Sequence, residues 1–166
     1  WYPSEVDVSI RPGWFHHPEQ DSQVRSLENL VNIYYQSVGR NSVLLLNIPP
    51  DRRGRIHEID SLRIKELKEY IDETFRTNLL SSPATVWKAE SNQTKEFPVK
   101  KDAVFNTLLI QEDISRGQRV ESFTLEVLCE GQWKKIAEGT TIGYKRLLRF
   151  PETSSEKIRI TINSTR

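Results

Sequence analysis

A change in hydrophobic pattern near residue 80 constrains the fold of this chain more than any other feature. Before it, apolar residues recur every three or four positions in two long stretches, which is typical of amphipathic helices. After it, the helical period disappears and short runs rich in β-branched and aromatic residues follow one another. The sequence therefore predicts two domains, residues 1–80 and 84–166, with a boundary at 79–84.

The first domain has a strand, helix, strand, helix order. Alternation predicts a strand at 5–10, and apolar spacing predicts a helix over 24–38, with Asp21 or Ser22 as its N-cap. The run at 42–48 is apolar without alternation, as in a strand covered on both faces of a parallel sheet. A second helix is predicted over 59–75. This order is typical of an α/β layer or barrel, and two strands cannot close either one alone.

The second domain is predicted to be an antiparallel β-sandwich, because short strands follow one another with Gly, Pro and Ser between them. The dipeptide Glu130-Gly131 has the form of a tight hairpin turn. The predicted strands are 85–89, 105–111, 121–129, 132–137, 140–142, 144–150 and 158–162.

Charge and hydropathy exclude several classes of partner. Lysine and arginine total 24 against 23 acidic residues, so no basic surface favours nucleic acid. The longest apolar run is far shorter than the roughly 20 residues of a membrane span, and we expect none. The chain begins at Trp1 and contains no methionine, which suggests a fragment of a longer protein.

One short loop gathers most of the candidate chemistry. Residues 11–17 combine a cation, two aromatic rings and two imidazoles, a set that suits the apolar faces and hydroxyl edges of sugars. Within it we predict Arg11, Trp14 and His16 as substrate contacts, with simple packing of Trp14 as the alternative. Adjacent His16 and His17 side chains diverge on an extended segment, so no metal site is predicted.

Three other groups of residues have both a functional and a structural interpretation. Glu5 and Asp7 lie about 6.6 Å apart on one strand face, above the carboxyl separation of about 5–5.5 Å in retaining glycosidases, so they are either part of a catalytic site or simply the solvated face of the strand. The loop 51–54 is either an anion site or a solvated turn. In the second domain, Trp87, Trp133 and Tyr144 are either a sugar platform or core aromatics.

The sequence resembles glycoside hydrolase family 29, the α-L-fucosidases, over residues 1–75, and the tail is similar to the C-terminal β-sandwich of those enzymes. The motifs have the form of the branch that prefers α-1,3/1,4-linked fucose. The stretches that carry the resemblance are WYPSEVDVSIRPGWFHH at 1–17, YYQSVGRN at 34–41 and LLLNIPPDRRG at 44–54.

This resemblance implies the last βα units of a partial (β/α)8 TIM-like barrel followed by an antiparallel β-sandwich. It also implies retaining hydrolysis of α-L-fucosyl linkages, with Glu5 as the general acid/base and without metal or cofactor. The family's nucleophilic aspartate lies on an earlier strand that this sequence does not contain, so the chain alone is expected to be inactive.

The expected partners are a fucosylated oligosaccharide or glycoconjugate and the N-terminal remainder of the barrel. The expected location is periplasmic or secreted, because the family's usual substrates are host or dietary glycans. The alternative is a non-catalytic carbohydrate-binding or structural β-sandwich fragment.

Overall fold

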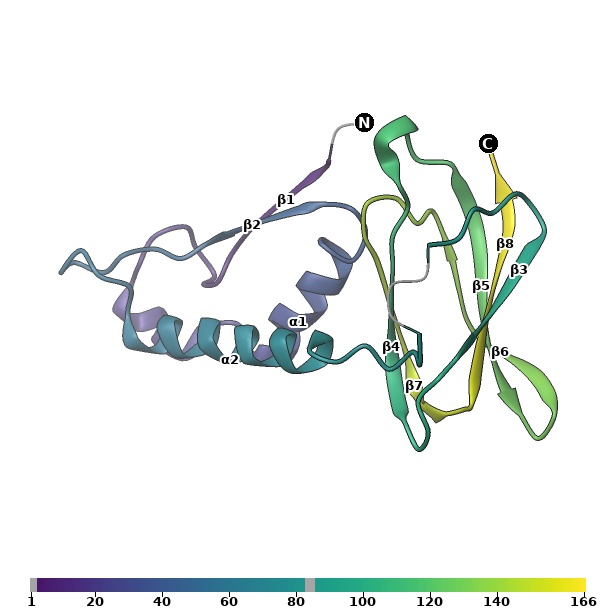
Figure 1. Cartoon of the computed structure of the whole chain (residues 1–166). Helices are drawn as coiled ribbons and strands as arrows, with labels where there is room; N and C mark the ends of the chain where they lie inside the picture. The colour runs from purple at the N-terminus through teal and green to yellow at the C-terminus, as the bar shows by residue number, and fades with distance from the viewer. Residues whose placement is uncertain (1–2, 83–85) are drawn as a thin grey trace. The chain divides into compact units, whose positions relative to one another are not determined.

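The chain folds into two compact units, which we describe separately (Figure 1). The computed structural model describes residues 3–82 and 86–166. Contacts divide the chain between Arg76 and Thr77, so that the first unit ends at Arg76 and the second spans Thr77–Arg166. None of the helices within the described ranges is both long and apolar enough to cross a membrane.

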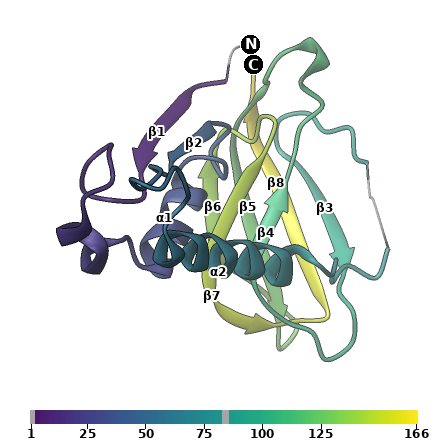
Figure 2. The same ribbon diagram turned by 90° about the vertical axis from the view of Figure 1, so that its left-hand side faces the viewer.

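The first unit is a two-stranded parallel sheet with two helices. Strands β1 (Glu5–Ser9) and β2 (Val43–Asn47) pair in register from Glu5 opposite Val43 to Ser9 opposite Asn47. A 3-10 helix, η1 (Pro18–Gln23), and helix α1 (Leu27–Gln36) lie between them in sequence, and helix α2 (Glu58–Phe75) follows β2. Both helices lie on one side of the two strands (Figures 1 and 2).

The strand, helix, strand, helix order predicted from the sequence is therefore confirmed, but the predicted start of the first helix is wrong. Helix α1 begins after Ser26, whose side chain accepts a 3.2 Å hydrogen bond from the backbone N–H of Asn29. Asp21 and Ser22, the predicted caps, lie within η1, which starts at Pro18. Proline favours the first turn of a helix, and here it starts a separate short one.

The second unit contains two antiparallel sheets, in agreement with the predicted sandwich. One has the strand order β3-β8-β5-β6 and the other pairs β4 with β7. A 3-10 turn, η2 (Ile114–Arg116), precedes β5. The strands are β3 (Gln93–Pro98), β4 (Val104–Ile110), β5 (Val120–Cys129), β6 (Gln132–Thr140), β7 (Arg146–Ser154) and β8 (Lys157–Thr165).

Two strands were predicted wrongly in this unit. Residues 86–89 form no strand, and Thr85 lies outside the described residues. The first strand is instead β3, whose sequence is mostly polar. The predicted strand at 140–142 also does not form, because Thr140 is the last residue of β6 and the chain then turns.

The core of the second unit follows from alternation along its central strands. Phe123, Leu125 and Val127 of β5 are each at most 1% exposed, and Ile158, Ile160 and Ile162 of β8 pack with them. The hairpin turn predicted between β5 and β6 is confirmed. Glu130 and Gly131 have φ values of 50° and 77°, the two positive values of a type I′ turn.

Candidate functional site

The aromatic loop predicted from the sequence leaves the C-terminal end of β1 and returns at the start of α1. We call residues 10–25 the Trp14 loop. Its two ends are joined by main-chain contacts, since the N–H of Arg25 donates to the carbonyl of Ile10 at 3.0 Å. Arg25 Nε also donates to the carbonyl of Ser9 at 2.8 Å. The loop is therefore closed at its base.

Asn47, the last residue of β2, holds the middle of this loop. Its Nδ2 donates to the carbonyl oxygen of Trp14 and to Ser9 Oγ, both at 3.0 Å. Ser9 Oγ in turn donates to the carbonyl of Gly13 at 2.7 Å. Two consecutive carbonyls of the loop are thus fixed by side chains at the ends of the paired strands.

Arg11 connects the loop to helix α2 through a buried ion pair. Its Nε lies 2.9 Å from Asp60 Oδ2 and its Nη1 lies 2.8 Å from Asp21 Oδ1. The side chains of Arg11 and Asp60 are 0% exposed. Burial by itself lowers the pKa of Arg11, but the hydrogen bonds and charges of the two aspartates outweigh it and raise that pKa.

Arg11 was predicted as a substrate contact. In this unit its guanidinium is directed at two carboxylates of the protein itself, while its Nη2 has no hydrogen bond to the described residues. These contacts fit a residue that fixes the loop. A direct contact of Arg11 with substrate stays a prediction.

His16 lies inside the loop beside Asp21 and His57. Its side chain is 7% exposed, and neither ring nitrogen makes a hydrogen bond within the described structure. His16 Nε2 lies 3.4 Å from Asp21 Oδ1, and His57 Nε2 lies 3.7 Å from Asp21 Oδ2. The two imidazole rings are 5.3 Å apart between centroids. The hydrogen bond from Arg11, together with the nearby histidines, lowers the pKa of Asp21.

These three residues have the composition of a metal-binding group, with one ligand atom from each lying within 4.8 Å of the others. Two contacts compete with a metal. Arg11 already binds Asp21 Oδ1, and His57 Nδ1 accepts a hydrogen bond from the N–H of Ile59 as the N-cap of α2. A neutral His57 therefore carries its proton on Nε2, the atom that would face the ion. We assign a polar cluster without a metal here, in which Asp21 is held by Arg11 and His57 by the N–H of Ile59.

A shallow hollow of about 260 Å³ lies next to this cluster. The two acidic side chains that line it are both paired with the same arginine. Arg53 binds Asp51 at 2.7 Å and Glu58 at 2.9 Å. The hydrogen bond from Arg53 lowers the pKa of Asp51 to about 2. Of the two interpretations of loop 51–54, these contacts favour a self-paired turn over an anion site. The hollow is lined by His16, Pro18, Asp51, Arg52, Arg53, His57 and Glu58.

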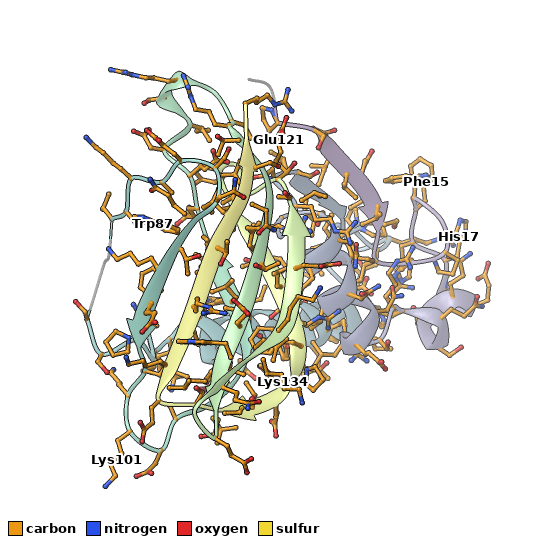
Figure 3. The ribbon with its side chains drawn as sticks, turned by 90° about the vertical axis from the view of Figure 1, so that its right-hand side faces the viewer. Phe15, His17, Trp87, Lys101, Glu121 and Lys134 are labelled. Atoms are coloured by element: carbon orange, nitrogen blue, oxygen red, sulfur yellow. The ribbon has the colours of Figure 1, made fainter. Side chains whose placement is uncertain are left out.

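The aromatic tip of the loop is open to solvent in this unit. Trp14 is 51% exposed and Phe15 is 76% exposed. Figure 3 labels Phe15 and His17, which lie on the outer side of the loop. The contact of Trp14 with substrate stays a prediction, and its exposed indole is accessible to a ligand in this unit.

Glu5 lies at the other end of β1. It is exposed, as is Asp7, and it lies four positions before Ser9 at the strand's end. At about 3.3 Å per residue, Glu5 is roughly 13 Å from the base of the Trp14 loop. The structure therefore does not bring Glu5 together with the residues predicted to bind substrate.

The aromatic residues of the second unit make separate packing contacts. Trp87 packs edge-on against Phe97 at 6.5 Å between ring centroids. The Arg159 guanidinium lies 4.5 Å from the ring centroid of Trp133 and also binds Glu126. Of Trp87, Trp133 and Tyr144, Tyr144 is the most open, with 53% of its surface exposed. These contacts favour packing over a sugar platform for the two tryptophans.

Sequence reasoning missed the residues that hold the loop. Asn47 ends an apolar strand, a position where a polar side chain reaches the site face of a parallel sheet, and this signal was available. Asp60 lies 49 positions after Arg11, and no local pattern connects the two residues. Asp21 was interpreted as a helix cap rather than as an ion-pair partner.

Residues 2–74 match the family model described as alpha-L-fucosidase. The chain is 37% identical over 200 residues to alpha-L-fucosidase 1 of Arabidopsis thaliana, a match that covers 100% of this chain. It spans only 37% and 38% of the length of the two curated relatives, from rice and A. thaliana.

Solved structures are also similar to the whole chain. A Bacteroides ovatus protein with a provisional alpha-L-fucosidase assignment is 53% identical, with a TM-score of 0.96 over 100% of this chain and 29% of that protein. A Ruminococcus gnavus family 29 fucosidase in complex with fucose is 29% identical, with a TM-score of 0.87 over 99% of this chain and 38% of that protein.

Proposed function

Because the family, curated and structural comparisons all support glycoside hydrolase family 29 as the family of this chain, we propose that it is part of an α-L-fucosidase. The complete protein would hydrolyse α-L-fucosyl linkages in glycans with retention of configuration. The observation that carries this proposal is the family match over residues 2–74, since that segment includes the whole Trp14 loop.

The first unit is proposed to be the end of a (β/α)8 barrel. Two parallel strands with both helices on one side have the local arrangement of consecutive βα units. In such barrels the active site lies at the C-terminal ends of the strands, and the Trp14 loop leaves β1 at that end. The strands that would complete the barrel are proposed to come from the rest of the protein.

The loop is proposed to contact the sugar through Trp14 and His16. An exposed indole offers an apolar face to the C–H groups of a pyranose ring, and the unbonded nitrogens of His16 can donate or accept hydrogen bonds. The fucose complex of the R. gnavus relative supports a fucosylated glycan as the ligand class. Arg11 would act chiefly by holding the loop, with any direct contact made through Nη2.

Family resemblance assigns the general acid/base role to Glu5. The position of Glu5 on β1 gives this assignment little support. In a retaining glycosidase the two carboxyl groups are about 5–5.5 Å apart, so both lie beside the same sugar. Glu5 lies about 13 Å along the strand from the loop base. Because barrel active sites lie at the C-terminal ends of the strands and Glu5 lies at the N-terminal end of β1, its acid/base role rests on the family resemblance alone.

The preference for α-1,3/1,4-linked fucose, which rests on the form of the motifs, is a further part of this proposal. So is a periplasmic or secreted location, which rests on the family's usual substrates. The second unit is proposed to support the barrel. The alternative is a carbohydrate-binding protein without catalysis, which predicts fucose binding with no turnover.

Hydrolysis of an aryl α-L-fucoside by the longest natural form of the protein tests the proposal. We expect turnover by the wild type and, in Glu5→Gln, a loss of several orders of magnitude that azide partly restores by replacing water as the nucleophile. Asp7→Asn, on the same strand face, is the matched control.

Full activity of Glu5→Gln would move the acid/base role to another residue and leave the family-level function intact. No turnover by the wild type, together with measurable fucose binding, would favour the alternative of a binding protein.

A further inference from the structure

We infer that Asn47 is a positioning residue that acts through Trp14, and this inference rests on the proposed function. Asn47 does not belong to the loop that is proposed to touch the sugar. It ends β2, opposite Ser9, and lies 33 positions after Trp14 in the sequence. Its side chain is nevertheless the direct connection between the strand ends and the Trp14 main chain.

The exposed tip of the loop requires such a connection. Trp14 and Phe15 are 51% and 76% exposed, so burial of their rings does not order the tip within this unit. Its order must come from the polar contacts below it. At the centre of those contacts, Asn47 Nδ2 uses both of its hydrogens, one for the Trp14 carbonyl and one for Ser9 Oγ.

The geometry makes the contact specific to an amide. The Trp14 carbonyl and Ser9 Oγ both accept from one nitrogen, at 3.0 Å each. Ser9 Oγ uses its own hydrogen for the Gly13 carbonyl at 2.7 Å, so it has none left for residue 47. A carboxylate at position 47 has no hydrogen to offer, and it would repel the carbonyl oxygen of Trp14.

The base of the loop stays anchored when this contact is lost. Arg11 remains bound to Asp21 and Asp60, and Arg25 remains bound to Ser9 and Ile10. We therefore expect Asn47→Asp to move the tip and to leave the fold of the unit in place. Displacements of about 1 Å in a sugar-binding group are enough to lower kcat/KM substantially.

A double-mutant cycle with Trp14 tests whether Asn47 acts through that ring. In the longest natural form of the protein, kcat and KM for an aryl α-L-fucoside are measured for Asn47→Asp, Asn47→Ala, Trp14→Ala and the two double variants. We expect kcat/KM to fall about 10-fold in Asn47→Asp and about 10- to 100-fold in Trp14→Ala, chiefly through KM. In the Trp14→Ala background, either Asn47 change should lower kcat/KM by less than about 2-fold more.

Asn47→Ala keeps the test decisive if Asn47→Asp fails to fold, because it removes the donor without adding a charge. Asn106→Asp, an exposed position on β4 in the second unit, is the matched control and should match the wild type. Hydrogen exchange of residues 10–25 gives a readout without activity, and we expect faster exchange there in both Asn47 variants and unchanged exchange in α1.

Fully multiplicative effects of the Asn47 and Trp14 changes, or unchanged exchange in the loop, would overturn the inference while the fucosidase function stands. A wild type without turnover would overturn the proposed function first, and the inference with it.

Discussion

Arg11 Nε lies 2.9 Å from Asp60 Oδ2, and both side chains are fully buried. The pair joins the start of the Trp14 loop to the first turn of α2, and Arg11 also binds Asp21 near the loop's other end. One guanidinium thus connects three segments that lie apart in the sequence. Arg11 therefore anchors the loop to α2, in addition to the contacts that Arg25 and Asn47 make with it.

Removing one partner of this pair should destabilise the protein strongly. Asp60→Asn leaves Arg11 buried with a single carboxylate, and loss of one partner of a buried pair costs about 3–5 kcal/mol. Thermal or urea unfolding of the natural protein measures the change. Asp72→Asn is the matched control, since it breaks the exposed ion pair with Lys68 on the same helix and should cost less than about 0.5 kcal/mol. Equal effects of the two substitutions would refute the structural importance assigned to Asp60.

Acid should destabilise the turn at Asp51. Its pKa is lowered from 3.8 to about 2, mainly by the hydrogen bond from Arg53. A carboxyl group with a lowered folded-state pKa stabilises the fold above its unfolded pKa, and this contribution is lost as the pH falls through the folded value. Melting temperatures should therefore decline between about pH 4 and pH 2, and less steeply in Asp51→Asn.

The carboxylate of Glu156 makes no ion pair within residues 3–82 and 86–166, which makes Glu156→Gln a suitable control for this acid response. It should keep the steeper wild-type decline. Identical slopes for wild type and Asp51→Asn would show that Arg53 does not hold Asp51 in this way in solution.

Gly139 in β6 should not tolerate a side chain. A Cβ added there would lie 2.7 Å from Cε1 and Cζ of Phe123, which is 0% exposed in the core. Gly139→Ala should therefore cost about 1–3 kcal/mol through overpacking, as measured by unfolding. Adding Phe123→Leu should recover part of that cost, because the shorter side chain removes the clash. Strictly additive costs would indicate that Gly139 matters for some other reason.

Elements that depend on the hydrophobic pattern of neighbouring residues could be predicted from the sequence. The apolar run of β2, the alternation of β5 and the Glu130-Gly131 turn each depend on neighbours in sequence, and all three formed as expected. Strand β3 was missed because it lies at the edge of its sheet. Only Phe97 among its residues is an apolar core member, so it lacks a clear alternating pattern.

The residue types of the candidate site could be predicted from the sequence. The hydrogen bonds and ion pairs that hold those residues in place could not. The sequence placed Trp14 and His16 in one loop, and the structure agrees with that grouping. The contacts Arg11–Asp60 and Asn47–Trp14 span 49 and 33 positions. No period or motif encodes contacts of this length, since they arise where α2 meets the Trp14 loop and where β2 pairs with β1.

The solvent-exposed face of β1 and β2 also affects whether two copies of the chain associate. Within the described residues β1 pairs only with β2, and the exposed Glu5 and Asp7 share this face with Val43 and Leu45. Aliphatic side chains beside unpaired strand edges promote edge-to-edge pairing, and charged neighbours oppose it. A second copy paired in register would place these carboxylates next to their own counterparts. We therefore expect the two acidic side chains to oppose self-association, so that replacing both with amides increases the light scattering of the protein in solution.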